Sequence, residues 1–303
     1  MDYRELLLLR AARETGVLNA LVSSADTPAE VADQAGVTER AAEATVGALV
    51  DLGFLEWVGG AVEPTNRMLG FVTKTDVRSV GSLPRKLDVT DALVDLPDAM
   101  HSGESPEFGV DEETTLRNRL GAAAARDDAE IRAAVTAAVR EHPDAESVLF
   151  VGDDAGQHAV EFARRGFDVA LRHEREVVDV LRPLLAPEPV ELVPGSVTEA
   201  VDADADLVVL PHALCPRSDG NARELLAASG ESAAENGVVV AVDTFGSDPA
   251  LTAELLAATQ SGAVREASTV AEWFDESGLA GAAVADVPGT PYGVVAARRR
   301  AVQ

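Results

Sequence analysis

The sequence predicts an α/β protein in which a doubly wound, parallel sheet follows an N-terminal half built of short helices. In the second half of the chain, short apolar runs between 147 and 243 alternate with helical patterns. This alternation is typical of parallel sheets that helices cover on both faces. The final segment, 282–297, has two apolar runs on either side of a Pro-Gly-Thr-Pro sequence, which predicts an antiparallel hairpin at the sheet edge.

The N-terminal half, 2–103, contains no long β-rich run. Thr27 is followed by Pro and, three positions on, by Glu, which is typical of the start of a helix. A second helix is expected between Thr38 and Gly53, since glycine readily takes the left-handed conformation that ends a helix. Two short apolar runs around a Gly-Gly pair in 54–63 predict a hairpin. Two helices followed by a hairpin indicate a winged helix.

The second of these helices would read DNA in a winged-helix regulator, but its charges oppose that role. Its charged side chains are Glu39, Arg40, Glu43 and Asp51, a net charge of −2. Because such a face repels phosphate, we expect the winged helix to serve packing and dimerisation. A transcription regulator remains a second alternative for the function.

The remaining elements of the second half can be placed by pattern. An Ala-rich helical stretch, 117–142, is broken near 126–130, where Asp128 is a candidate N-cap for its second piece. The expected strands are 147–151, 168–171, 190–193, 206–210 and 237–243, with helices at 159–165, 176–185 and 222–235.

Composition limits the partners and the location. The 303 residues carry 52 Asp and Glu against 25 Lys and Arg, a formal charge of −27, and Lys74 and Lys86 are the only lysines. Such a surface is similar to that of proteins from high-salt cytoplasm, and it disfavours nucleic acid and anionic membranes as partners. No apolar run approaches the roughly 18 residues of a membrane span, and 6–9 is too short for an export signal. We therefore expect a halophilic, cytoplasmic protein.

Two further features bear on assembly and chemistry. Leu6, Leu7 and Leu9 form an apolar stripe that is expected to need cover, which favours a homodimer. Cys215 is the single cysteine, so a disulfide within the chain and a metal site built of cysteines are excluded.

The loop that leaves the first strand, 152–156, begins and ends with glycine and runs directly into a helix. In open α/β sheets, ligands bind beyond the carboxyl ends of the strands. The free N–H groups at the start of a helix favour anionic groups there. The loop is therefore the expected ligand site.

The chain resembles the small-molecule O-methyltransferases that use S-adenosylmethionine, such as the caffeate, hydroxyindole and polyketide-tailoring enzymes. The resemblance implies a winged-helix dimerisation domain (1–103), a helical linker (104–142) and a Rossmann-like class I methyltransferase domain (143–303). It also implies S-adenosylmethionine as cofactor and a small-molecule hydroxyl as acceptor. The residues that carry it are 11–21, 48–55, 96–104, 148–156, 176–178, 193–195, 237–243, 271–274 and 277–279.

In the first motif of that family an acidic residue precedes G-x-G-x-G, which implies that Gly152, Asp154 and Gly156 bind the cofactor. Here Phe150 stands at the acidic position and Asp154 at the middle glycine. A side chain at a position that favours glycine occupies space that the cofactor would enter. The Asp154 carboxylate would repel the cofactor's own carboxylate or pair with its ammonium group.

The resemblance also implies positions for the ribose and the adenine. The acidic residue that accepts the ribose hydroxyls aligns with His173, and Glu174 takes its place if the strand ends one residue later. Ser196 stands where the family has an aspartate near the adenine, and its hydroxyl can donate or accept one hydrogen bond.

The histidine that serves the family as general base aligns with Cys215, whose thiol is a poor base at its ordinary pKa. His212, three residues earlier, is the candidate for a displaced base. Asp243 matches the family at the end of the fifth strand. Because several site positions differ from the family's residues, an alternative function stays open: a protein of this fold that acts as a binding or regulatory partner and does not transfer methyl groups.

Overall fold

A computed structural model describes residues 1–72, 77–104, 111–152, 155–259 and 261–300, without the side chains of 70–72. Two compact units are formed, Met1–Val94 with Glu107–Ala122, and Asp95–Pro106 with Ala123–Gln303. The boundaries at 103 and 142 stay a prediction. In the described part of the chain no helix is both long enough and apolar enough to cross a membrane.

The first unit has its core among its N-terminal helices and a short hairpin. Asp2 caps α1 with a capping box, and the side chains of Thr27 and Thr38 accept backbone N–H groups at the starts of α3 and α4. The hairpin expected at 54–63 is confirmed, with Trp57 opposite Val62. Its elements are α1 (Tyr3–Glu14), α2 (Val17–Ser23), α3 (Pro28–Ala35), α4 (Glu39–Asp51), β1 (Leu55–Val58), β2 (Ala61–Pro64), α5 (Asn66–Val72), α6 (Val77–Val80), α7 (Leu83–Val94) and α9 (Glu112–Ala124).

The apolar stripe on α1 differs from the expectation. Leu9 is fully buried in the core that α1 forms with α2 and α4, and Leu6 packs against the same core half-buried. Leu7 is 41% exposed, and Tyr3, on the same helix, is 68% exposed. The reason is helical spacing, since Leu6 and Leu9 share the inward face of α1 and Leu7 does not.

A buried polar network joins α1, α7 and α9. Arg10 and Arg13 of α1 pair with Asp91 of α7, and Arg13 also reaches Asp88 at 3.3 Å. Asn118 of α9 donates to the other oxygen of Asp88 at 2.9 Å. Asp88 is 1% exposed, and burial raises its pKa although Asn118 and Arg13 act against the shift.

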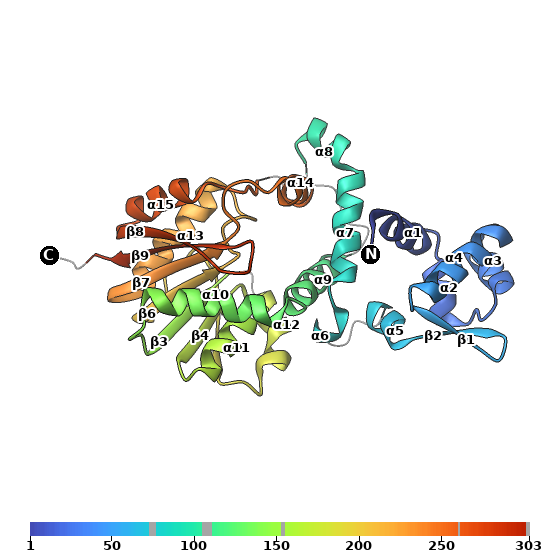
Figure 1. Cartoon of the computed structure of the whole chain (residues 1–303), viewed down its shortest axis with the longest axis horizontal. Helices are drawn as coiled ribbons and strands as arrows, with labels where there is room; N and C mark the ends of the chain where they lie inside the picture. Colours follow the sequence, from blue (N-terminus) through green and yellow to red (C-terminus); the bar gives the residue numbers. More distant parts are fainter. Residues whose placement is uncertain (73–76, 105–110, 153–154, 260, 301–303) are drawn as a thin grey trace. The chain divides into compact units, whose positions relative to one another are not determined.

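The second unit is built on a seven-stranded sheet in the order β5-β4-β3-β6-β7-β9-β8. All neighbours are parallel except β9, which runs antiparallel to β7 and β8. This is the expected α/β, Rossmann-like class I methyltransferase fold with its antiparallel C-terminal hairpin (Figure 1). The strands are β3 (Ser147–Val151), β4 (Asp168–His173), β5 (Val190–Pro194), β6 (Ala205–Pro211), β7 (Ala233–Asp243), β8 (Leu279–Asp286) and β9 (Gly293–Arg299).

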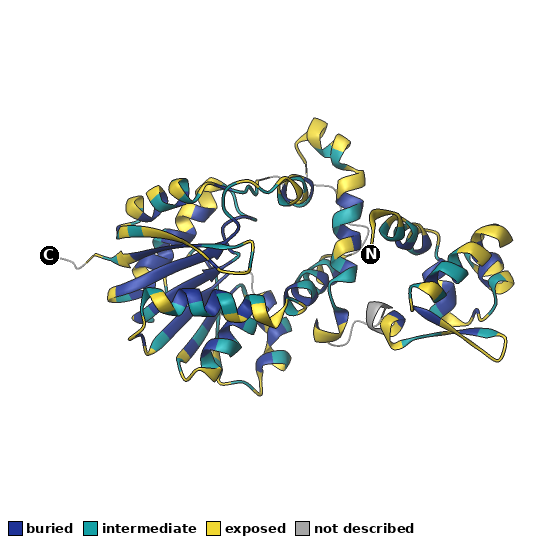
Figure 2. Ribbon diagram, in the orientation of Figure 1, coloured by how far each residue is buried: buried dark blue, intermediate teal, exposed yellow. Residues whose placement is uncertain are grey.

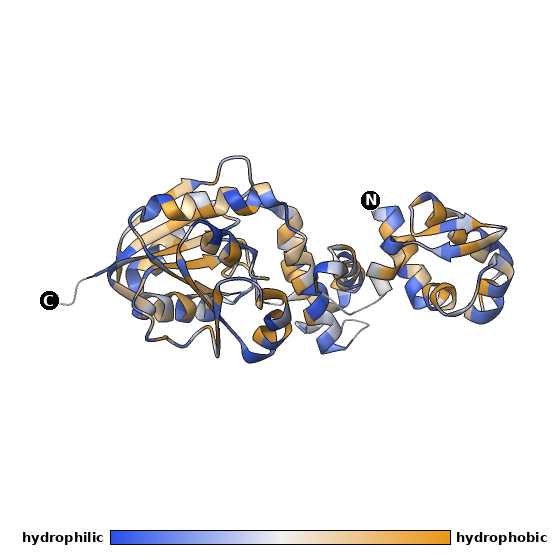
Figure 3. Cartoon of the chain, turned by 90° about the horizontal axis from the view of Figure 1, so that it is seen from below, coloured by the Kyte–Doolittle hydropathy of each residue, from blue (hydrophilic) through white to orange (hydrophobic). Residues whose placement is uncertain are grey.

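Helices cover both faces of this sheet, as the apolar strands require. The central strands are buried along most of their length (Figure 2), and their hydrophobic residues contrast with hydrophilic helix surfaces (Figure 3). Figure 1 shows α10 and α11 on one face and α13 and α15 on the other. The helices are α8 (Leu96–Ser102), α10 (Asp128–Glu141), α11 (Gln157–Arg164), α12 (Arg175–Leu185), α13 (Asp219–Ser232), α14 (Pro249–Ala258) and α15 (Ala267–Glu276).

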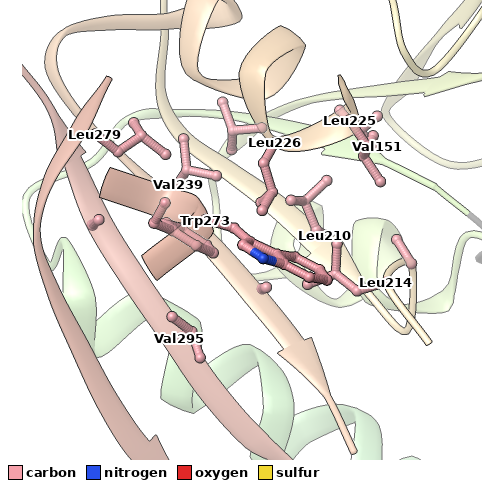
Figure 4. Packing of buried hydrophobic residues seen from close by; sticks show 14 of the residues in the cluster. Val151, Leu210, Leu214, Leu225, Leu226, Val239, Trp273, Leu279 and Val295 are labelled. Carbon is pink, nitrogen blue, oxygen red and sulfur yellow. The ribbon is translucent and has the colours of Figure 1, made fainter. Parts of the chain in front are cut away.

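A hydrophobic core of the unit surrounds Trp273 of α15. Its indole lies among leucine and valine side chains from β6, β7 and α13 (Figure 4). Only 2% of Trp273 is exposed. This cluster fixes α13 and α15 against the sheet and so positions the loops at its carboxyl edge.

Several predicted boundaries were wrong, among them those of α10 and α13. The N-cap of α10 is Asp127 and not Asp128, because the Asp127 side chain accepts the N–H of Ala129 at 2.7 Å. The helix expected at 222–235 is α13, which starts earlier because Ser218 caps it, and ends at Ser232. Its predicted last residues belong to β7, where Ala233 pairs with Ala205.

Candidate active site

The strand order reverses between β3 and β6, because the chain continues from β3 to β4 on one side and from β6 to β7 on the other. The loops after β3 and β6 meet at this point. Gly152 has φ +130°, and a Cβ on it would lie 2.6 Å from the Cβ of Ala213. Ligands bind at such a reversal in open α/β sheets.

Gly156 starts α11 in the left-handed conformation, with φ +88°. A Cβ at this position would lie 2.7 Å from Leu185 of α12. Both glycines of the loop are thus required by contacts within the protein itself. Asp154, the third predicted residue of this loop, lies outside the described residues.

At the exit of β4 the two candidates for ribose binding have different environments. His173 is 1% exposed, and its Nδ1 accepts the backbone N–H of Glu174 at 2.8 Å. Glu174 is half-buried at the start of α12. Its Oε1 accepts the N–H of Val197, in the loop after β5, at 3.2 Å. The Glu174 carboxylate therefore lies between two exit loops, whereas the His173 ring lies inside the protein.

Ser196 follows β5 in the same region. Its hydroxyl lies 3.0 Å from the hydroxyl of Thr198. Its carbonyl accepts Nε of Arg172 at 3.1 Å, and the Pro194 carbonyl accepts Nη1 of Arg172 at 3.0 Å. The Arg172 guanidinium occupies the space into which a Cβ on Gly195 would project. Sequence reasoning missed Arg172, since nothing in the pattern of β4 relates it to a carbonyl more than twenty positions away.

The loop after β6 is held by Asp243, at the end of β7. Its Oδ2 accepts the N–H groups of Leu214 at 2.9 Å and Cys215 at 3.0 Å. The Cys215 thiol is buried and donates to the carbonyl of Thr244 at 3.3 Å. Burial first, and then the Asp243 carboxylate, raise the pKa of Cys215 far above its ordinary value. Cys215 is therefore a neutral core residue and cannot act as a base.

Arg265 holds the same loop from the other side and was also missed. Its guanidinium donates to the carbonyls of Leu214 at 3.0 Å and Arg217 at 2.6 Å. Its Nε donates to Asp219 at 2.9 Å, and the guanidinium lies over the Trp273 ring. The loop is thus fixed by two charged side chains at once.

His212 lies at the exit of β6, immediately before Ala213. Its backbone has φ +53° and donates to the Val242 carbonyl at 2.7 Å. Its imidazole meets the Tyr292 ring edge-on, with centroids 4.4 Å apart, and lies 5.8 Å from the ring of His158 in α11.

Tyr292, which precedes β9, links this group to α10. Its hydroxyl donates to Oε2 of Glu130 at 3.3 Å. Burial and the Glu130 and Asp243 carboxylates raise the pKa of Tyr292, so its hydroxyl stays protonated. Sequence reasoning found His212 but not its neighbours His158, Tyr292 and Glu130.

Among the described residues, no three His, Cys, Asp or Glu side chains come together as a metal site requires.

Solved methyltransferase structures are similar to this chain over nearly its whole length. PigF with SAH gives a TM-score of 0.74 at 17% identity, over 98% of this chain and 96% of PigF. The mitomycin 7-O-methyltransferase MmcR gives 0.69 at 18% identity, over 97% and 94%. Human N-acetylserotonin methyltransferase in complex with SAM gives 0.64 at 20% identity, over 98% and 94%.

These likenesses show the fold. No protein-family model matches the chain. No curated protein matches it.

Proposed function

We propose that this protein is an S-adenosylmethionine-dependent methyltransferase that acts on a hydroxyl group of a small molecule. The observation that carries the proposal is the Glu174 carboxylate, held between the exit loops of β4 and β5 beside the reversal of strand order. The similar structures of PigF and the human enzyme, which are described with SAH and with SAM, support it.

The residues present fit an adenosyl group. Glu174 has one oxygen fixed by Val197, so the carboxylate is oriented, and a carboxylate is a strong acceptor for a pair of hydroxyls. The Ser196 hydroxyl, which pairs with Thr198, would be a further polar group for the same ligand, and α11 begins directly after the Gly152 loop. Bound cofactor would supply an electrophilic methyl group. The chain's own contribution is to orient the two reactants, which can lower the barrier strongly.

A second candidate function is that of a protein with this fold that binds the cofactor but does not catalyse methyl transfer. The observation that favours it is Cys215, which stands where the resembling family has its base and is locked in the core by Asp243. The two candidates agree on cofactor binding and differ on turnover.

Calorimetric titration of the full chain with S-adenosylmethionine and with S-adenosylhomocysteine, in molar KCl, tests the shared step. We expect Glu174→Ala to weaken binding at least tenfold because the ribose hydroxyls lose their acceptor. The control is Glu176→Ala, two positions along α12 and exposed, which should bind like the wild type. The absence of heat at millimolar ligand would refute the proposed function.

Turnover separates the two candidates. Conversion of S-adenosylmethionine to S-adenosylhomocysteine is measured with a panel of phenols and alcohols that includes N-acetylserotonin. Acceptor-dependent product supports the methyltransferase, and tight binding without product supports the second candidate.

The proposal includes a cytoplasmic, salt-adapted homodimer. It is supported by the formal charge of −27 and by the exposed Tyr3 and Leu7 on α1. Light scattering after gel filtration at high salt tests it, and a Leu7→Glu variant should shift the mass toward that of one chain.

A further inference from the structure

The start of β7 contains an irregularity in the sheet. After its first pair with β6, β7 resumes the ladder only at Val238, so that the segment 234–237 lies opposite the single residue Asp206. Pairing with β9 on the other side also begins at Val238, opposite Arg298. The segment 234–237 is therefore a bulge, and a bulge takes its extra residues out of the regular ladder.

The backbone of this bulge explains the sequence Asn236-Gly237. Asn236 has φ +67°, a left-handed conformation that asparagine and glycine tolerate better than most residues. A Cβ on Gly237 would lie 2.9 Å from the carbonyl oxygen of Ala205 and 3.0 Å from backbone atoms of Ala234, so no side chain fits there. The fold thus places an asparagine directly before a glycine. No other asparagine of the chain precedes a glycine.

In this pair the side-chain amide of the asparagine is open to attack by the main chain. The nucleophile is the backbone nitrogen of the next residue, and Gly237 has no side chain to crowd its approach. Asn236 is exposed, so water reaches it. Among the described residues, no hydrogen bond holds its side-chain amide.

Arg298 of β9 acts on the same peptide group. Its Nη1 donates to the carbonyl oxygen of Asn236 at 3.2 Å. That carbonyl belongs to the peptide bond whose nitrogen is the nucleophile, and negative charge collects on its oxygen when the nitrogen loses its proton. A charge-assisted hydrogen bond to this oxygen stabilises the deprotonated form. The sheet therefore supplies a cation where the reaction needs one.

We propose that Asn236 is a site of spontaneous modification, at which the folded chain converts asparagine to aspartate and isoaspartate with the help of Arg298. The Gly237 nitrogen loses its proton and bonds to Cγ of Asn236, while the side-chain carbon–nitrogen bond breaks and the amide nitrogen leaves with that proton as ammonia. Water then opens the five-membered ring at either carbonyl. One water is consumed and one ammonia is released, without oxidation or reduction. The reaction does not depend on the proposed function.

Both products change the contacts of β7 with its neighbours. Aspartate adds a negative charge beside the Arg298 guanidinium. Isoaspartate adds one carbon to the main chain two residues before Val238, where the ladder resumes. A longer backbone at this point disturbs the register of β7, and the register decides which side chains face the core. The isoaspartate form should therefore be the less stable product.

The test follows the full chain in molar KCl at mildly alkaline pH by mass spectrometry of its tryptic peptides. We expect peptide 224–265 to gain the mass of an amide-to-acid conversion and to contain isoaspartate. Asn221, exposed and followed by alanine, is the internal control and should stay unchanged. Arg298→Met should slow the reaction at least about threefold in the folded chain and leave the rate in urea unchanged. Arg298→Lys, which keeps a cation, and Arg300→Met should react like the wild type.

The outcomes decide the two parts of the proposal separately. Conversion in urea but not in the folded chain would overturn the site, because the bulge would then protect Asn236. Equal rates for the folded wild type and Arg298→Met would overturn the part given to Arg298. Unfolding of that variant would bring its rate to the value in urea, so circular dichroism is recorded beside each rate. A folded Arg298→Met chain that reacts more slowly, with Arg298→Lys restoring the rate, supports both parts.

Discussion

The carboxylate of Asp243 accepts the backbone N–H of Cys215 at 3.0 Å and so ties the loop after β6 to the end of β7. The same carboxylate accepts the N–H groups of Leu214 and Thr244. One side chain, 2% exposed, thus satisfies three buried donors at the carboxyl edge of the sheet.

Asp243→Ala should therefore destabilise the second unit strongly. Three buried N–H groups lose their acceptor, and each unsatisfied group costs about 1 to 3 kcal/mol. We expect a loss of at least about 3 kcal/mol in the free energy of unfolding, measured by urea denaturation at high salt and followed by Trp273 fluorescence. Asp286→Ala, at an exposed position in β8, is the control and should change it by less than about 0.5 kcal/mol.

The Cys215 thiol should be inert in the folded protein. Its pKa is raised from 9.0 by burial and by Asp243, so the folded chain keeps the proton where an unfolded chain loses it. The contribution of Cys215 to the free energy of unfolding is therefore fully present below pH 9, the pKa of the thiol in the unfolded chain. It is lost as the pH rises from there toward the higher pKa of the folded chain. Iodoacetamide at pH 9.5 should label Cys215 at least 100-fold more slowly in buffer than in urea. Equal rates would contradict the buried position.

Much of the fold was predictable because its signals are local. Apolar runs placed β3, β6 and β7, and Thr27 and Thr38 marked the starts of α3 and α4 as predicted. The N-cap of α10 was missed by one residue because two aspartates adjoin, and only geometry shows that Asp127 accepts the N–H of Ala129.

The site was predictable only in part. The loop and His212 follow from strand exits, but the choice between His173 and Glu174 depends on a single residue of register, and successive residues of a strand point to opposite faces. Arg172 and Arg265 act on carbonyls that lie 24 and 51 residues away in the chain. No local pattern encodes such contacts.

In the first unit, Arg13→Met should be costly. Arg13 pairs with two buried carboxylates of α7, Asp88 and Asp91, and removing one partner of a buried pair costs about 3 to 5 kcal/mol. We expect a large drop in the urea midpoint of this unit, followed by Trp57 fluorescence. Arg4→Met is the matched control on α1, because the Arg4 side chain is 75% exposed and such ion pairs contribute less than about 1 kcal/mol.

Gly195→Ala tests whether Arg172 shapes the proposed cofactor site. Gly195 has φ +150° and its added methyl would collide with the Arg172 guanidinium, which would have to leave the carbonyls of Pro194 and Ser196. Gly166→Ala is the control, since Gly166 has φ +94° but nothing within 4 Å of an added Cβ. Both variants carry backbone strain of about 1 kcal/mol, and only Gly195→Ala also loses these hydrogen bonds.

The expected result is therefore a difference between the two glycine variants. Gly195→Ala should weaken S-adenosylhomocysteine binding at least tenfold because the loop that carries Ser196 shifts, while Gly166→Ala binds normally. The double variant Gly195→Ala with Arg172→Ala has no guanidinium for the added methyl group to collide with. It also lacks the hydrogen bonds from Arg172 to the carbonyls of Pro194 and Ser196. Its affinity should stay low, because the loop then lacks its anchor. Wild-type affinity in this double variant would show that the guanidinium has no part in holding the site.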